Sequence, residues 1–286
     1  MAPPLMQPVC NYLENMMSGG GPLDTLGPNA THVLFAADWR REFVLDEVRE
    51  EYLALKEDVT TTGRLAVVMS GPMGAGKTTL RQELCDGRGG PLSGAYRVID
   101  PDMVKDLLLR RAVADGTFEA FLAWRLPDRR PLMPRELAGL VHAESNQVAD
   151  DIRSICMRRG EDIVIEGTLR WDRQPGVLLD ELDDRGYREL TILGAEVNLE
   201  ESCRRARERW WNIRDTGVDP MGGRFVPRSA IAQCYREEAD VDRRSLCWAN
   251  AQNLYERAST TSNLEAVSIT QKDGVELHQA SYRRST

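Results

Sequence analysis

The chain has 286 residues, enough for one large domain with its own core, or for one domain with appendages. Its net charge of -8 argues against a general nucleic-acid binder, because such proteins usually carry a basic face. No stretch approaches 18 consecutive apolar residues, and no Lys or Arg precedes Arg40, so neither a membrane span nor a secretory signal is predicted. Six cysteines lie far apart without a C-x-x-C pair, which favours reduced thiols and a cytoplasmic protein.

The two ends of the chain are predicted to lie outside the folded domain. Residues 1–39 contain many prolines and a run of three glycines, a composition that favours a flexible leader. An arm that orders on a partner is the alternative. Residues 40–57 have the apolar spacing of an amphipathic helix and begin the predicted domain, residues 40–258. The polar residues 259–286 are predicted to form a poorly ordered tail.

The stretch MSGPMGAGKTTL, residues 69–80, fits the phosphate-binding pattern G-x-x-x-x-G-K-[ST], the Walker A motif. A predicted strand, residues 64–70, runs into it and a predicted helix, residues 78–85, follows, as the motif requires. Lys77 is predicted to reach the β- and γ-phosphates of ATP, and the Thr78 hydroxyl to ligate Mg2+. The predicted nucleotide-binding residues are Gly71, Pro72, Met73, Gly74, Ala75, Gly76, Lys77, Thr78 and Thr79.

Apolar strands alternate with helices along the rest of the domain. The further predicted strands are residues 96–100, 162–168 and 190–197. The further predicted helices are residues 103–112, 134–160, 176–186, 199–213 and 229–257, with a Gly/Pro-rich loop at 214–227. This alternation predicts the α/β class, a parallel sheet covered by helices on both faces.

Asp100 and Asp102 stand at the carboxyl end of the second strand, which is where ligands bind on an open parallel sheet. A carboxylate there could accept the proton of a substrate hydroxyl that attacks the γ-phosphate. Asp102 also stands just before a helix, where it would make a good N-cap. Position alone does not separate these two roles. An N-K-x-D guanine signature is missing from the sequence, so a GTPase switch has little support.

Five motifs together resemble one family. GPMGAGKTTL, VIDPDMVK, ESNQVADDIRSICMRRGEDIVIEGTLR, ERWW and GGRFVP, in that order and spacing, resemble the zeta toxin family of P-loop kinases, the toxin halves of bacterial toxin-antitoxin pairs. The similarity covers about residues 60–255. It implies a P-loop kinase-like fold and a kinase that moves the γ-phosphate of ATP onto a hydroxyl of UDP-N-acetylglucosamine. It also implies a cognate antitoxin as a possible protein partner.

The resemblance also implies roles for individual residues. Asp102, rather than Asp100, falls on the position of the catalytic base. Arg209 and Arg224 match two arginines that stabilise charge on the transferring phosphate. The loop Gly217 to Gly223 lies between them, and it could close as a lid that brings Arg224 inward. The implied catalytic residues are Asp102, Lys77, Arg209 and Arg224.

The implied substrate-binding residues are Asp102, Asp150, Glu166, Thr168 and Arg170. The last three occupy alternate positions where a strand leaves the sheet, so they point to one side if the extended geometry continues. The alternative is that Glu166 and Arg170 simply pair with each other. The family usually has Glu at the position of Asp150, and the shorter side chain would make its contact to the sugar water-mediated or absent.

Other functions remain open from the sequence. Residues 114–135 match nothing closely and are predicted to line the acceptor pocket, so the acceptor could be another small alcohol, such as an antibiotic or a nucleotide cofactor. An ATP-gated binding module with little turnover is a second alternative. A kinase of nucleic-acid 5′-hydroxyls is disfavoured by the acidic charge. Trp210 and Trp211 are predicted to pack in the core rather than to stack on bases.

Overall fold

The structure is a computed structural model that describes residues 4–84, 95–236 and 244–284. The chain divides into two compact units, and each unit is assembled from three separate segments. Unit 1 holds Met1–Ala54, Pro101–Asp151 and Arg205–Arg228. Unit 2 holds Leu55–Asp100, Ile152–Arg204 and Ser229–Thr286.

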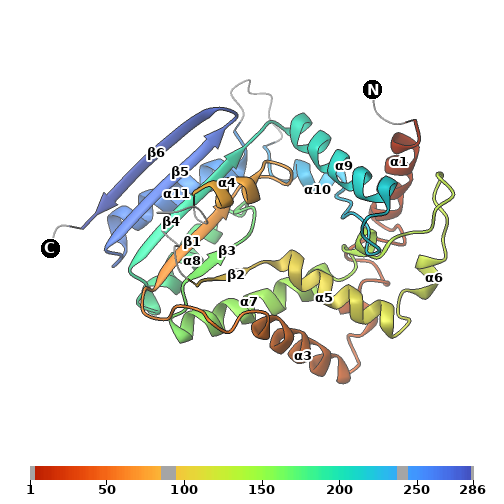
Figure 1. The fold of residues 1–286 in the computed structure, drawn as a ribbon, viewed down its shortest axis with the longest axis horizontal. Coiled ribbons are helices and arrows are strands. Elements are labelled where there is room, and N and C mark those ends of the chain that lie inside the picture. The colour runs from red at the N-terminus through yellow and green to blue at the C-terminus, as the bar shows by residue number, and fades with distance from the viewer. Residues whose placement is uncertain (1–3, 85–94, 237–243, 285–286) are drawn as a thin grey trace. The chain divides into compact units, whose positions relative to one another are not determined.

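Unit 2 is built on a six-stranded sheet with the order β2-β3-β1-β4-β5-β6. Its strands are β1 (Leu65–Ser70), β2 (Arg97–Ile99), β3 (Ile163–Ile165), β4 (Glu189–Glu196), β5 (Ala266–Asp273) and β6 (Glu276–Arg283). β1 to β5 pair in parallel, and β6 pairs antiparallel with β5 at the edge (Figure 1). The four predicted strands are confirmed, although β3 ends at Ile165.

Helices cover both faces of this sheet. The helices of unit 2 include α4 (Lys77–Leu84), α8 (Gln174–Asp184) and α11 (Leu246–Thr261). Val67 and Met69 of β1 pack in one cluster with Leu80 of α4. Ser70 of β1 donates its hydroxyl to the carbonyl of Cys247 in α11 at 2.7 Å. Successive strand residues point to opposite faces, so α4 and α11 lie on opposite faces of the sheet.

Unit 1 is helical. Its elements are α1 (Met6–Met17), α2 (Thr31–Leu34), α3 (Arg40–Ala54), α5 (Pro101–Ala114), α6 (Glu119–Leu122) and the 3-10 helix η1 (Pro134–Leu137). The first part of α7 (His142–Arg159) and the last part of α9 (Leu199–Thr216) also belong to it. α5 packs against both α3 and η1. The helix predicted at 134–160 is thus two elements. α7 ends before Gly160, whose φ of 68° makes it a left-handed cap of the helix.

The prediction of a flexible leader at residues 1–39 is wrong for α1. Val9, Cys10 and Leu13 are completely buried, and Glu14 forms an ion pair with Arg207 of α9 at 3.1 Å. Pro8 lies in the first turn of α1, where its missing N–H costs no helical hydrogen bond. The segment is ordered because unit 1 supplies apolar partners that its composition does not reveal.

The prediction of a poorly ordered tail at residues 259–286 is also wrong. β5 extends the parallel sheet and buries Val267, Ile269 and Gln271 at alternate positions. β6 returns beside it through a two-residue turn in which Gly274 has a φ of 60°. The strand pattern of β5 is hard to recognise in the sequence, because only one face of the strand is apolar and the other face carries polar residues.

Two further expectations are affected at their boundaries. The helix predicted at 229–257 is two helices, α10 (Arg228–Ala232) and α11, and residues 237–243 lie outside the described part of the chain. Cys85, the last residue of the helix predicted after the Walker A motif, also lies outside it. The described cysteines are buried. Among the described helices, none combines the length and the apolar character needed to cross a membrane.

Candidate active site

The Walker A loop connects the carboxyl end of β1 to the start of α4. Gly71, Gly74 and Gly76 have φ angles of 139°, 85° and 96°, which residues with a side chain rarely adopt. A Cβ atom on Gly71 would lie 2.2 Å from the carbonyl oxygen of Ala195 in β4. Only glycine therefore allows the loop to pass this close to the neighbouring strand.

Hydrogen bonds fix the loop to the segments on both sides of β1. Gly71 N donates to the carbonyl of Thr168, after β3, at 3.1 Å, and the Ser202 hydroxyl donates to the carbonyl of Met73. Lys77 Nζ donates to the carbonyls of Gly71 and Pro72 at 2.8 and 3.0 Å. The Lys77 ammonium group thus lies against the loop. This position is expected if the lysine and the loop bind the same phosphates.

The loop also lies where an open α/β sheet binds ligands. β1 stands between β3 and β4, so the chain leaves β1 toward one edge of the sheet and later continues on its other side. Such a switch in strand order creates a crevice at the carboxyl ends of the strands. Thr78 and Thr79 are exposed in the first turn of α4. This arrangement suits a triphosphate with Mg2+. The backbone N–H groups, the helix N-terminus and Lys77 can bind the phosphates, and a hydroxyl oxygen can ligate the metal.

The alternation expected from Glu166 through Thr168 to Arg170 stops before it reaches Arg170. Leu169 is buried and has a φ of 56°, so the extended geometry does not continue. Its carbonyl accepts a hydrogen bond from the Asn250 side chain at 2.9 Å, which holds the turn in place. Glu166 forms an ion pair with Arg81 of α4, with Oε1 3.3 Å from Nε. Arg81 therefore anchors Glu166 to the helix that follows the Walker A loop.

Asp102 lies in the first turn of α5 in unit 1. The helix begins at Pro101, so the alternative role of Asp102 as an N-cap is wrong. Its carboxylate is half exposed and binds two cations, Arg224 Nη1 at 2.7 Å and Lys105 Nζ at 2.9 Å. The structure thus brings together the carboxylate predicted to be the base and one of the two predicted arginines.

Arg224 also contacts Asp106, at 2.7 Å, a residue that the sequence analysis did not single out. Asp106 lies four positions after Asp102 on α5, so both carboxylates share one helix face. That spacing is a signal visible in the sequence. The partner of the two carboxylates is not visible there, because Arg224 follows 118 residues after Asp106.

The other predicted residues of unit 1 have separate surroundings. Arg209 and Asp150 are exposed on α9 and α7, and their roles stay predictions. Trp210 is completely buried, packs edge-on against Phe225 at 4.9 Å and donates to Glu136 at 2.8 Å. The prediction that this tryptophan packs in the core is confirmed.

The predicted site residues divide between the units. Unit 1 contains Asp102, Asp150, Arg209 and Arg224. Unit 2 contains the Walker A loop with Lys77 and Thr78, together with Glu166, Thr168 and Arg170.

Comparison with protein families assigns the chain. The model of the zeta toxin family matches residues 125–280, which is more than half of the sequence. The chain belongs to the zeta toxin family. The matched region includes Glu166 and Arg224 but begins after the Walker A loop and Asp102, whose support is the motif and geometry described above. A search of curated proteins found no match.

Solved structures share the fold of this zeta toxin family member. One, from the PezAT chromosomal toxin-antitoxin system of Streptococcus pneumoniae, is 14% identical with a TM-score of 0.50, and the alignment covers 84% of this chain and 81% of that chain. Another, AvrRxo1-ORF1:-ORF2 with ATP, is 15% identical with a TM-score of 0.52, over 95% of this chain and 70% of that chain. These likenesses confirm the predicted P-loop kinase-like α/β fold.

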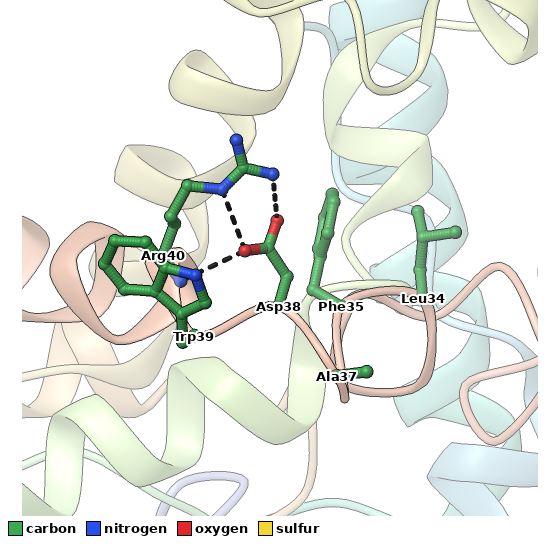
Figure 2. Close-up of a pocket in the computed structure, with 6 residues that line it drawn as sticks. All are labelled: Leu34, Phe35, Ala37, Asp38, Trp39 and Arg40. Atoms are coloured by element: carbon green, nitrogen blue, oxygen red, sulfur yellow. Dashed lines mark hydrogen bonds and ion pairs between the residues drawn. The ribbon is translucent and has the colours of Figure 1, made fainter.

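A shallow hollow in unit 1 contains none of the predicted site residues. Figure 2 shows its lining, which comes from one continuous stretch of chain: Leu34, Phe35, Ala37, Asp38, Trp39 and Arg40. Asp38 binds the Arg40 guanidinium through two hydrogen bonds of 2.9 Å. The one carboxylate in the hollow is therefore already neutralised by its neighbour.

In this zeta toxin family member, the buried side chain of Glu196 lies at the carboxyl end of β4. Within the described part of the chain, only one of its two carboxyl oxygens accepts a hydrogen bond. Ser245 donates to Oε2 at 2.6 Å, whereas Oε1 is buried and has no hydrogen-bond partner among the described residues. Burial raises the pKa of Glu196 from 4.5 to about 7, and the charge of Asp273 adds to the increase. The ionised form of this group therefore destabilises the folded state.

We expect Glu196→Gln to stabilise the protein at pH 8 and to change little at pH 5. Because the folded pKa lies above the unfolded value, the native state binds the extra proton, and stability is lost as pH rises from about 4.5 through 7. Above pH 7, ionised Glu196 costs the folded state about 3 kcal/mol of stability, and the neutral amide of Gln removes this cost. Thermal unfolding at both pH values measures it, with exposed Glu276→Gln as the control. Equal shifts at the two pH values would contradict the assignment.

Proposed function

We propose that this protein is an ATP-dependent kinase that transfers the γ-phosphate to a hydroxyl of UDP-N-acetylglucosamine, and acts as a toxin against cell-wall synthesis. Membership of the zeta toxin family supports the nucleotide-sugar acceptor. The observation that carries phosphoryl transfer is the contact of Asp102 with Arg224 at 2.7 Å. Transfer to an alcohol needs a carboxylate that accepts a proton beside a cation that stabilises the phosphoryl charge.

In this proposal Asp102 accepts the proton of the acceptor hydroxyl while the hydroxyl oxygen bonds to the γ-phosphorus and the bond to the β-phosphate oxygen breaks. Lys77 and the N–H groups of the Walker A loop hold the phosphates. Arg209 and Arg224 neutralise charge on the transferring group. Thr78 would ligate Mg2+, which supplies further charge neutralisation when bound. Positioning and preorganised charge provide most of the rate enhancement.

The acceptor is proposed to contact Asp102, Asp150, Glu166, Thr168 and Arg170. Thr168 and Glu166 are held beside the Walker A loop, through the bond of Thr168 to Gly71 and the ion pair of Glu166 with Arg81. Asp150 and Arg170 complete the proposed set. A cognate antitoxin is proposed as the protein partner, and the cytoplasm as the site of action.

Labelled ATP tests this function directly. With γ-labelled ATP and Mg2+, we expect the wild-type protein to move label onto UDP-N-acetylglucosamine. Parallel reactions offer other small alcohols, an RNA with a free 5′-hydroxyl, and water alone. Label on a different alcohol would support the proposed kinase activity but reject UDP-N-acetylglucosamine as the acceptor. Label released only as inorganic phosphate in every reaction would reject transfer to an alcohol.

A further inference from the structure

Asp106 lies between two guanidinium groups of unit 1. Its Oδ1 accepts from Arg224 Nη2 at 2.7 Å, and its Oδ2 accepts from Arg135 Nη2 at 2.9 Å. Arg135 Nε lies 3.0 and 3.1 Å from the two carboxylate oxygens. All three side chains are only about one-fifth exposed. The negative charge of Asp106 thus holds together two cations that would otherwise repel each other.

Arg135 connects this carboxylate to the loop that precedes Arg224. Its backbone N–H, in η1, donates to the carbonyl of Met221 at 2.8 Å. Its Nη1 donates to the carbonyl of Gly222 at 2.9 Å and to the carboxylate of Asp219. The same bond to Arg135 lowers the pKa of Asp219 below its ordinary value. The loop expected to act as a lid is therefore anchored to η1 and α5, and its movement would have to break these bonds.

Arg224 is held by three oxygen atoms of α5. Nη1 contacts the Asp102 carboxylate at 2.7 Å, and Nη2 donates both to the Asp102 carbonyl at 2.9 Å and to Asp106. A long arginine side chain loses much rotational freedom in such an arrangement. These three contacts to one helix define where the guanidinium of Arg224 lies relative to the Asp102 carboxylate.

We propose that Asp106 and Arg135 are positioning residues that hold Arg224 beside Asp102, so that α5, η1 and residues 219–224 present the base and the arginine as one preassembled group. The kinetic meaning of this inference rests on the proposed function. Charges that are already in place need no rearrangement when the phosphoryl group moves. A displacement of about 1 Å can cost a catalytic group about 100-fold in rate.

A double-mutant cycle tests whether Asp106 acts through Arg224. We expect Asp106→Asn to lower kcat by about 10- to 100-fold and to leave the KM for ATP unchanged. In an Arg224→Lys background the same substitution should cost little more, because the group that it positions is already altered. Glu47→Gln is the matched control, since Glu47 also pairs with an arginine of α5, Arg111, but on an exposed surface. This control should keep wild-type kcat.

A wild-type kcat in folded Asp106→Asn protein, or independent losses that multiply in the double variant, would overturn the proposal. The same four proteins are compared by thermal unfolding, which requires no catalysis. We expect the two midpoint shifts to be non-additive, because the side chains contact each other. If the wild type transfers phosphate to no acceptor, the proposed function is rejected. The unfolding cycle then decides alone, and additive shifts would reject the positioning role.

Discussion

Asp102→Asn is expected to slow phosphoryl transfer by about 100- to 10,000-fold, the usual contribution of a positioned general base. The amide keeps the size of the side chain but accepts no proton from the acceptor hydroxyl. ATP binding should stay close to the wild-type level, because the Walker A loop and Lys77, and not Asp102, are proposed to hold the phosphates. Single-turnover label transfer measures the first quantity, and calorimetric titration with ATP measures the second.

Two further variants make this result specific. Lys77→Ala should weaken both ATP binding and transfer, since its ammonium lies against the loop that binds the phosphates. Asp151→Asn should change neither, because Asp151 is a half-exposed carboxylate of unit 1 that forms a long, 3.5 Å pair with Arg49. A wild-type rate of phosphoryl transfer in the Asp102→Asn variant would reject Asp102 as the general base. An ATP-gated binding module, for example, requires Lys77 but not Asp102.

Arg214→Met is expected to destabilise the protein by about 3 to 5 kcal/mol, as is usual when one partner of a buried ion pair is removed. Arg214 is completely buried and binds Asp128 at 2.8 Å and Glu136 at 2.9 Å. Both carboxylates are buried too, and burial raises the pKa of Glu136. Without Arg214 they would be left unpaired in the interior. Urea unfolding followed by tryptophan fluorescence measures the loss, since Trp210 also binds Glu136.

Arg111→Met is the control for this effect. Arg111 pairs with Glu47 and Glu51, whose side chains are about half exposed, and such pairs contribute less than about 1 kcal/mol. If the two variants lose similar stability, then the buried ion pairs of Arg214 with Asp128 and Glu136 contribute no more than the exposed pairs of Arg111. Since residues 114–135 are predicted to line the acceptor pocket, a partly folded Arg214→Met protein should also lose acceptor binding before ATP binding.

Local sequence patterns predicted the strand, loop and helix around the Walker A motif well. The Walker A motif occupies consecutive residues, and its glycines, lysine and flanking elements can be recognised without knowledge of any distant contact. The β1 strand and α4 helix were predicted within one residue of their observed starts. The end of the helix predicted at 134–160 also agrees with the structure, since α7 ends at Arg159.

Segments with mixed polarity were predicted poorly. α1 was mistaken for a flexible leader because only one helix face is apolar, and its partners lie far along the sequence, as with Glu14 and Arg207. β5 was mistaken for part of a tail for a similar reason, since Gln271 occupies one of its three buried positions. Burial of such residues depends on neighbours from other segments, which composition does not specify.

By itself the sequence determined the phosphate-binding loop, the α/β class and the family resemblance, because these depend on residues at fixed short spacings. Only the tertiary structure decided which charges meet. Arg224 reaches Asp102 across 122 residues, and Arg135 reaches Asp106 and Asp219 across 29 and 84 residues. Thirty-three arginines offer many possible partners to each carboxylate, and the packing of α5 against η1 selects among them. The path of the whole chain decides which of these ion pairs form. Coulomb attraction depends on the distance between two charges in space, and their separation along the sequence does not reveal that distance.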